Sequence, residues 1–301
     1  MNDFFPTIEV PDDADQSTED MGTKYKFWYR HPELGRCLFK QARPNTGEDW
    51  AEKLTAELAQ KLNLPHVRYE LATFKSEPGS ISKSMLSPNA ILQHGNEILA
   101  SLVSTYPAAA TYGVRQHTLD LVIQSIDSPQ VSAPYGWTLP TGVSSAIGTF
   151  IGYLLLDAWV SNSDRHHENW GFIVLENRFY LAPTYDHGSS LGRELLDSKR
   201  KSIFANGSVT NYIQNSRSAM YRTVNDKKAL LNLEVFQIAA NRYPDATKVW
   251  LQKLADISPD DITELLFKVP ETRLSPIARE FTQQILLQNQ IRLLNIRDSL
   301  S

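Results

Sequence analysis

Three side chains suited to phosphoryl transfer lie close together in the second half of the chain. The polar stretch "SNSDRHHENWGFIV" carries Asp164 and Asn169, and "WGFIVL-EN-RFYLAP" predicts a hairpin that ends shortly before Asp186. Because a hairpin reverses the chain, we expect Asp186 to return close to Asn169. Carboxylate and amide oxygens are hard ligands that Mg²⁺ takes alongside phosphate oxygens and water. The pattern therefore predicts a metal site at Asn169 and Asp186, with Asp164 facing an incoming hydroxyl as a base.

A phosphoryl-transfer site also needs a cation for the nucleotide phosphates, and Lys40 fits that role. It ends the predicted strand "RCLFK". Apolar residues recur every four positions in "GEDWAEKLTAELAQKLNL", which predicts an amphipathic helix directly afterwards. A carboxylate on that helix, Glu52 or Glu57, could pair with Lys40 and fix its position.

Each of these residues also has an ordinary structural interpretation. Asp and Asn in loops usually cap helices or form turns, and a lysine at the end of a strand is usually solvated. The ordered series of lysine, helix, aspartate, asparagine, hairpin and aspartate favours function instead. His166 and His167 could suggest zinc, but adjacent side chains point in different directions and lack the i, i+4 spacing of a helical zinc motif. We therefore favour phosphoryl transfer over a zinc site.

The order of the predicted elements indicates an α+β protein with two lobes. The strands "KYKFWYR" and "RCLFKQA", the helix above and a hairpin over "HVRYELATF" and "GSISKSML" form a small N-lobe at residues 21–95. Long helical patterns dominate residues 96–301, the larger C-lobe, whose predicted strands are those of the metal-binding hairpin alone. One of its helices should begin at Ser258, directly before Pro259. Residues 1–20 are rich in carboxylates, have no Lys or Arg, and predict a mobile acidic tail.

Composition argues against several classes of protein. The formal charge is −4 and the pI is about 6.0, so no basic excess indicates a nucleic-acid surface. Cys37 is the only cysteine, which rules out an intramolecular disulfide and fits a reducing cytoplasm. The most apolar segment, residues 147–160, contains Asp157 and is too short to span a bilayer, and the N-terminus lacks the features of a signal peptide. We therefore expect a cytoplasmic protein that has no direct nucleic-acid or membrane partner.

The motifs that carry this chemistry resemble those of HipA-like kinases, the bacterial serine/threonine kinases of toxin–antitoxin systems. These kinases share the protein-kinase fold and are distantly similar to phosphatidylinositol 3/4-kinases. The resemblance rests on "NSDRHHENWG", "LAPTYDHGSSLG", "GRCLFKQARPNTGEDWAEKLTAELA" and "MGTKYKFW", and it extends over nearly the whole chain from Met21. It implies a bilobal α+β kinase fold that uses ATP and Mg²⁺ as cofactors.

The resemblance also implies a role for each matching residue. Asp164 would be the catalytic base, and Asn169 and Asp186 would hold Mg²⁺. Lys40 would contact the nucleotide phosphates, with Glu52 as its partner on the helix. The segment "STEDMGTKYK" stands where the family has its phosphate-covering loop, and its candidate contacts are Gly22, Thr23, Lys24 and Lys26. The adenine would lie near "LQHGNE", at His94, Gly95 and Asn96.

The same resemblance bears on partners and regulation. It implies a protein substrate, for which an aminoacyl-tRNA synthetase is the family precedent, and a separately encoded antitoxin. It also implies autophosphorylation of the phosphate loop, where the nearest acceptors in this sequence are Ser17 and Thr18.

Two alternatives stay open at this point. The same fold could phosphorylate a small molecule or a lipid, although the sequence shows no basic membrane-binding cluster. The chain could also be a pseudokinase that binds nucleotide and regulates a partner, because the phosphate-loop segment contains a single glycine, Gly22.

Overall fold

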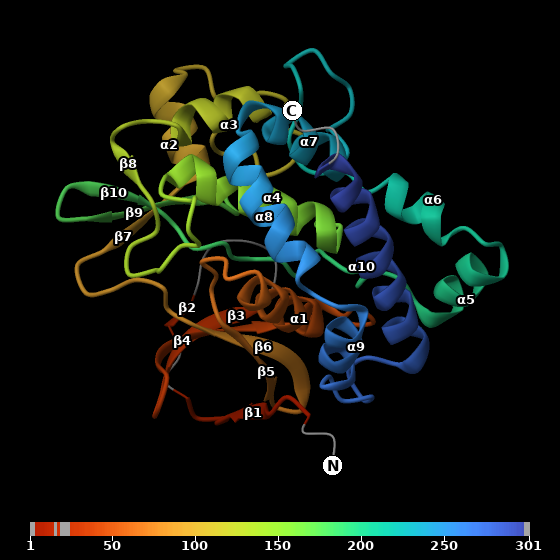
Figure 1. The fold of residues 1–301 in the computed structure, drawn as a ribbon. Helices are drawn as coiled ribbons and strands as arrows, with labels where there is room; N and C mark the ends of the chain where they lie inside the picture. The colour runs from red at the N-terminus through yellow and green to blue at the C-terminus, as the bar shows by residue number, and fades with distance from the viewer. Residues whose placement is uncertain (1–3, 15–16, 19–24, 298–301) are drawn as a thin grey trace.

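The computed structural model describes residues 4–14, 17–18 and 25–297, which fold into two lobes (Figure 1). A six-stranded sheet and one helix form the first lobe. Its strands follow the order β1 (Thr7–Val10), β5 (Tyr69–Phe74), β6 (Glu77–Lys83), β4 (Gly35–Gln41), β3 (Lys26–His31) and β2 (Ser17–Thr18). β1 runs parallel to β5, and the remaining neighbours pair antiparallel. The two predicted strand pairs, β3–β4 and β5–β6, are confirmed.

The N-terminal residues differ from the prediction of a mobile acidic tail. β1 adds to the edge of the sheet, where Val10 lies opposite Phe74 and is 1% exposed. Glu9, the acidic residue of this strand, is exposed, and Ile8 is half-buried. The tail prediction is wrong for these residues because net charge says little about a strand in which apolar and polar side chains alternate between two faces.

Helix α1 (Glu48–Lys61) packs against β5 and β6 and is tied to both lobes. Trp50 and Leu54 on its apolar face are buried, which confirms the predicted amphipathic helix. On another face, Asp49 Oδ2 lies 2.7 Å from Nη1 of Arg273, a residue of the second lobe. Because both side chains of this pair are largely buried, the ion pair fixes the start of α1 to the second lobe.

A second, four-stranded sheet lies in the larger lobe and was only partly predicted. Its order is β7 (Ile91–His94), β9 (Gly171–Leu175), β10 (Arg178–Leu181) and β8 (Val131–Ser132). The β9–β10 hairpin is confirmed. No strand was predicted from the sequence at β7 or β8, and residues 91–94 were assigned to the first lobe. Such short segments become strands only through the neighbours they pair with. The change from one sheet to the other therefore falls between β6 and β7.

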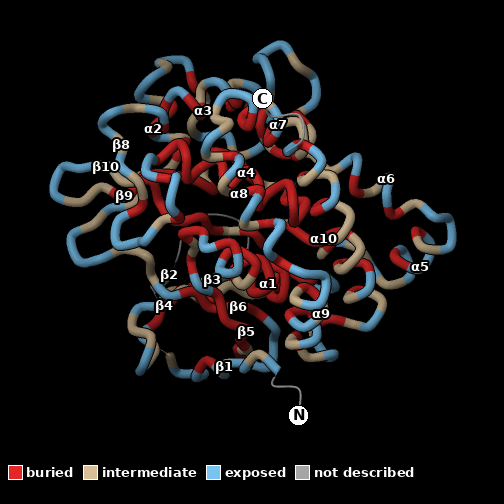
Figure 2. The backbone as a smooth tube through the Cα atoms, viewed as in Figure 1, coloured by how far each residue is buried: buried red, intermediate tan, exposed pale blue. Residues whose placement is uncertain are grey.

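The second lobe is built around one fully buried helix, α4 (Ala146–Val160), which is coloured as buried along its length in Figure 2. Helices α7, α8 and α10 pack around it. Ser258 caps α9 as predicted, with its hydroxyl accepting from Asp261 N.

No helix in the described part of the chain combines the length and apolar character needed to cross a membrane. The other helices are α2 (Gly95–Leu102), α3 (Leu119–Ile126), α5 (Asp197–Ala205), α6 (Val209–Gln214), α7 (Asn232–Arg242), α8 (Pro244–Ala255), α9 (Pro259–Phe267) and α10 (Pro276–Arg297).

Replacing Val10 tests whether β1 is part of the folded lobe. Val10→Asp places a charge among the buried side chains of the sheet, and we expect it to lower the free energy of unfolding by about 3 kcal/mol. Glu9→Gln, at the exposed neighbouring position, should leave it within about 0.5 kcal/mol of the original value. Urea unfolding followed by fluorescence measures both. Equal stability of the two variants would show that β1 does not contribute to the fold.

Candidate active site

A buried ion pair at the end of α4 organises the loop that follows it. Arg165 donates from Nε to Asp157 Oδ2 and from Nη2 to Asp157 Oδ1, both at 2.7 Å, and both side chains are almost completely buried. The guanidinium also reaches the backbone oxygen of Asn169 at 2.6 Å and Thr184 Oγ1 at 2.9 Å. Arg165 therefore joins α4, the loop between α4 and β9 (residues 161–170) and the segment after β10.

The same network orients Asp164 and Asn169. Asn162 donates to Asp157 Oδ1 at 2.8 Å and accepts from the backbone N–H of Asp164 at 3.1 Å. Asn169 Nδ2 donates to the backbone oxygen of Asp164 at 2.7 Å. Since a carbonyl oxygen only accepts, the amide nitrogen of Asn169 must face it, and the amide oxygen points to the opposite side. The loop leaves α4 at Ser161, whose left-handed backbone (φ 55°) ends the helix.

Lys40, at the end of β4, lies between carboxylates from both lobes. Its Nζ is 2.9 Å from Asp186 Oδ2 and 3.7 Å from Glu52 Oε1. The other oxygen of Glu52 accepts from the backbone N–H of His187 at 2.8 Å. Burial by itself would lower the pKa of Lys40, but the charges of Asp186 and Glu52 outweigh it and hold this pKa well above its usual value. Lys40 is therefore a fixed positive charge in the site.

Asp186 adopts a backbone conformation that few residues other than glycine accept. Its φ is 57°, in the left-handed region, which costs on the order of 1 kcal/mol for a residue with a side chain. In this conformation its backbone N–H donates to the hydroxyl of Tyr69 at 3.1 Å, while its carboxylate meets Lys40. The local strain is thus balanced by two contacts that aim the carboxylate at the first lobe.

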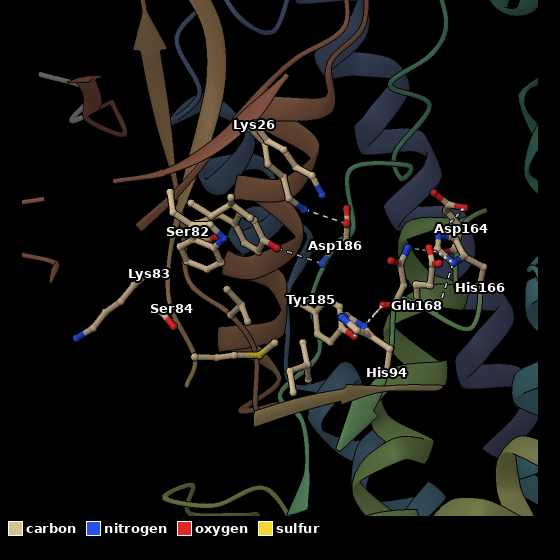
Figure 3. A pocket seen from close by; sticks show the side chains of 18 of the residues that line it. Lys26, Ser82, Lys83, Ser84, His94, Asp164, His166, Glu168, Tyr185 and Asp186 are labelled. Atoms are coloured by element: carbon tan, nitrogen blue, oxygen red, sulfur yellow. Dashed lines mark hydrogen bonds and ion pairs between the residues drawn. The ribbon is translucent and has the colours of Figure 1, made fainter. Parts of the chain in front are cut away.

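These groups line one cavity of about 230 Å³ between the lobes. Figure 3 shows Asp164, His166 and Glu168 entering it from the loop between α4 and β9. The sheet of the first lobe provides the opposite wall, through residues such as Lys26 and Ser82. The predicted site residues that line this cavity are Lys26, Lys40, His94, Asp164, Asn169 and Asp186.

Other predicted residues lie elsewhere. Glu52 is 2% exposed and contacts the cavity through Lys40. Asn96, predicted to contact the adenine, does not line this cavity, and its amide nitrogen in the first turn of α2 donates to the backbone oxygen of Ala108 at 3.1 Å. Gly95 packs against Trp170 instead of facing the cavity. The predicted contacts Gly22, Thr23 and Lys24 lie outside the described residues.

The two adjacent histidines do not form a zinc site. The rings of His166 and His167 lie 6.1 Å apart at 78° to each other. His166 lines the cavity, whereas His167 Nδ1 contacts the hydroxyl of Tyr106 at 2.8 Å inside the protein. Within the ranges that the structure describes, no cluster of three or more His, Cys, Asp or Glu side chains could hold a metal ion.

The donor set of the cavity fits a magnesium–nucleotide complex better than a bare metal ion. Asp186 offers a carboxylate and Asn169 an amide oxygen, which are too few for an all-protein cage. Mg²⁺ characteristically takes one or two protein oxygens and completes its shell with phosphate oxygens and water. The ion pair between Lys40 and Asp186 shows that this carboxylate already stabilises a cation.

Several residues of the site were not predicted. Tyr69 holds the backbone of Asp186, and Tyr185 donates to the backbone oxygen of Glu168 at 2.8 Å. Tyr112 is 72% exposed at the cavity rim, with its ring 5.8 Å from that of His166. For Tyr185 a signal existed, since it directly precedes Asp186 in a segment the sequence had already placed at the site. Tyr69 lies in a predicted strand of the first lobe that nothing in the sequence connected with the site. The position of Tyr112 depends on the path of a loop that has no recognisable pattern.

Comparison with known proteins gives structural relatives only. No family model matches the chain, and no curated protein sequence matches it. A Helicobacter pylori proinflammatory kinase, CtkA, matches with a TM-score of 0.76 and 18% identity over 98% of both chains. HipA of Shewanella oneidensis, solved with HipB and operator DNA, matches with a TM-score of 0.61 and 13% identity. That match covers 95% of this chain and 68% of the HipA chain. The chain therefore has the HipA-like kinase fold, which confirms the predicted bilobal α+β architecture.

The buried ion pair between Arg165 and Asp157 should contribute most to the stability of the loop between α4 and β9. Asp157→Ala leaves the Arg165 guanidinium buried without its counter-ion, and we expect it to cost about 3–5 kcal/mol in the free energy of unfolding. Asp120→Ala is the matched control, because its 2.6 Å pair with Arg242 is exposed and should contribute less than about 1 kcal/mol. Urea titration measures both. A similar loss in the two variants would contradict the central role of the Arg165 network.

Buried histidines should make stability fall in mild acid. Burial lowers the pKa of His117 to about 3 and that of His167 to about 4, from 6.5. His117 is held neutral, because Nδ1 donates to Ala219 O and Nε2 accepts from Trp170 Nε1, both at 3.1 Å. The unfolded chain takes up these protons first, so stability is full above about pH 7 and falls as the pH drops below 6.5.

The size of that effect can be measured between pH 7 and pH 5. His117→Asn removes one such group, so the slope of unfolding free energy against pH should become shallower by about 1.4 kcal/mol per pH unit at the acid end of this range. Denaturant unfolding at several pH values gives the slope. An unchanged slope would show that His117 titrates normally in the folded protein.

Proposed function

We propose that this protein is a Mg²⁺- and ATP-dependent serine/threonine protein kinase of the HipA-like type. The observation that carries the proposal is the meeting of Lys40 and Asp186 at 2.9 Å in a cavity that Asp164 and Asn169 also line. These four side chains come from two lobes and from three separate segments of the chain. The fold, shared with a kinase, supports the same reading of the cavity.

Each residue has a role that its chemistry supports. Lys40 binds the nucleotide phosphates, and Glu52 keeps its ammonium in the cavity. Asn169 and Asp186 would hold Mg²⁺, which would neutralise charge on the phosphates. Asp164 accepts the proton of the acceptor hydroxyl while that oxygen bonds to the γ-phosphorus, and the bond to the β–γ bridging oxygen breaks to release ADP.

The remaining wall of the cavity suits an adenine ring. Leu38, Val67, Met85 and Leu92 supply an apolar lining, as ligand pockets for flat heterocycles require. His94 lies beside this lining, with Nδ1 2.8 Å from the backbone oxygen of Glu168. We assign the adenine to this end of the cavity and the phosphates to the end that holds Lys40.

The acceptor and the partners belong to the proposal as well. We propose that the acceptor is a serine or threonine of another protein, of the kind that a translational toxin would modify, and that the kinase also phosphorylates itself. The solved HipA chain was crystallised with HipB and DNA, which supports a separately encoded antitoxin here. About a third of that HipA chain has no counterpart in the match, so the surface that would contact a partner can differ here. Co-purification with proteins encoded nearby is the direct test of such a partner.

Intact-protein mass spectrometry after incubation with ATP and Mg²⁺ tests the function. The wild-type protein should gain phosphate, and Asp164→Asn should lower the rate about a thousandfold because the acceptor proton loses its base. Omitting Mg²⁺ in the presence of a chelator should abolish the gain. Labelled ATP with bacterial lysate, inositol lipids and aminoglycosides, in separate reactions, identifies the class of acceptor.

Controls separate catalysis from folding. Glu176→Gln is the same change from carboxylate to amide in an exposed hairpin turn, and it should keep full activity. Asp164→Asn should bind ATP and unfold as the wild type does. Transfer that persists in Asp164→Asn would refute the assignment of the base. Nucleotide binding without transfer to any acceptor would replace the kinase with a pseudokinase, and transfer to a lipid or an aminoglycoside alone would replace the protein substrate.

A further inference from the structure

A chain of polar contacts connects Asp164 with the first turn of α1. Ser189 Oγ lies 3.4 Å from Asp164 Oδ2, and Arg193 Nη2 lies 3.2 Å from Ser189 Oγ. The other terminal nitrogen of Arg193, Nη1, is 3.0 Å from Oε1 of Glu48. None of these contacts is used by the roles assigned above. They run from the reacting carboxylate in the second lobe to a helix of the first.

The direction of this chain follows from the chemistry of its members. A guanidinium only donates, so Ser189 Oγ must accept from Arg193. The hydroxyl hydrogen of Ser189 is then left to donate, and the Asp164 carboxylate accepts it. This hydrogen bond from Ser189 fixes the direction in which Oδ2 of Asp164 points. Hydrogen bonds around a catalytic base are commonly long before substrate binds, which fits the 3.4 Å contact.

Both ends of this series of polar contacts are held by further hydrogen bonds. The Ser189 backbone oxygen accepts from the N–H and the hydroxyl of Ser163, at 3.1 and 3.2 Å, so Ser189 is fixed beside the catalytic loop. Glu48 is 3% exposed, and Gly47 N donates to the backbone oxygen of Arg193 at 2.9 Å. Arg193 is therefore held at the start of α1 by both its side chain and its backbone.

We propose that Ser189 and Arg193 are positioning residues that orient the Asp164 carboxylate and tie that orientation to the Glu48 end of α1. The inference rests on the proposed function, because it takes Asp164 as the base. Neither residue reaches the reacting atoms in this scheme. Ser189 acts on Asp164 directly, and Arg193 acts through Ser189.

Steady-state kinetics of Ser189 variants tests the proposal, with phosphotransfer from ATP as the measured activity. Ser189→Ala should lower kcat about tenfold and leave the KM for ATP within about twofold, since it disturbs the base and not the nucleotide site. Ser189→Thr keeps the hydroxyl and should restore most of kcat. Ser190→Ala is the matched control, because the buried hydroxyl of Ser190 meets no hydrogen-bond partner within the described part of the chain.

Arg193 supplies the second half of the test. Arg193→Ala should lower kcat in the same sense, and combining it with Ser189→Ala should cost no more than the larger single loss, because the two residues act in series. Additive losses, or a Ser189→Ala variant as fast as Ser190→Ala, would overturn the proposal. The proposed function and this inference can be refuted separately. A wild-type protein that transfers no phosphate refutes both. An active wild type in which Ser189→Ala and Ser190→Ala have equal rates refutes the inference alone.

Discussion

The buried ion pair between Arg165 and Asp157 is the constraint on which the rest of the site depends. Asp157 belongs to α4, whose every residue is buried and which other helices of the second lobe surround. A charge in that position is costly unless it is paired and hydrogen-bonded, and here both carboxylate oxygens are used by the guanidinium. The hydrogen bonds of Arg165 to Asn169 and Thr184 fix these two residues relative to the buried helix. The loop between α4 and β9 is therefore held in one geometry although it has no regular secondary structure.

Charge balance explains why the cavity is stable as it stands. Lys40 and Asp186 neutralise each other, and Glu52 adds a second carboxylate at 3.7 Å. A magnesium–nucleotide complex would bring both signs of charge, phosphates for Lys40 and a cation for Asp186. Each partner then exchanges one ionic contact for another, so the site need not bury an unpaired charge at any stage. The left-handed backbone of Asp186 sets the carboxylate in that position before any ligand is bound.

The sequence predicted the parts of this site that depend on local chemistry. The β9–β10 hairpin follows from alternation around a turn, and α1 follows from its apolar repeat, so Lys40, Asp164, Asn169 and Asp186 were placed together. Features decided by distant partners were missed. β1 becomes a strand because β5 offers an edge, and β7 and β8 because the hairpin does. The orientation of Asn96 depends on how α2 meets a loop, and no spacing in the sequence reports that.

Helix α1 positions two charged residues of the site in addition to its apolar face. Its apolar positions pack it between the lobes, and this was readable from the repeat. Glu48 and Glu52, one turn apart, lie on one face of the helix, as residues spaced by four must. Glu52 contacts Lys40, and Glu48 contacts Arg193, which is connected through Ser189 to Asp164. Both contacts are thus made from one helix, and the ion pair between Asp49 and Arg273 fixes this helix to the second lobe. A displacement of α1 would move the partners of Lys40 and of Arg193 together, so we expect the proposed phosphate contact and the proposed base to depend on the position of this helix.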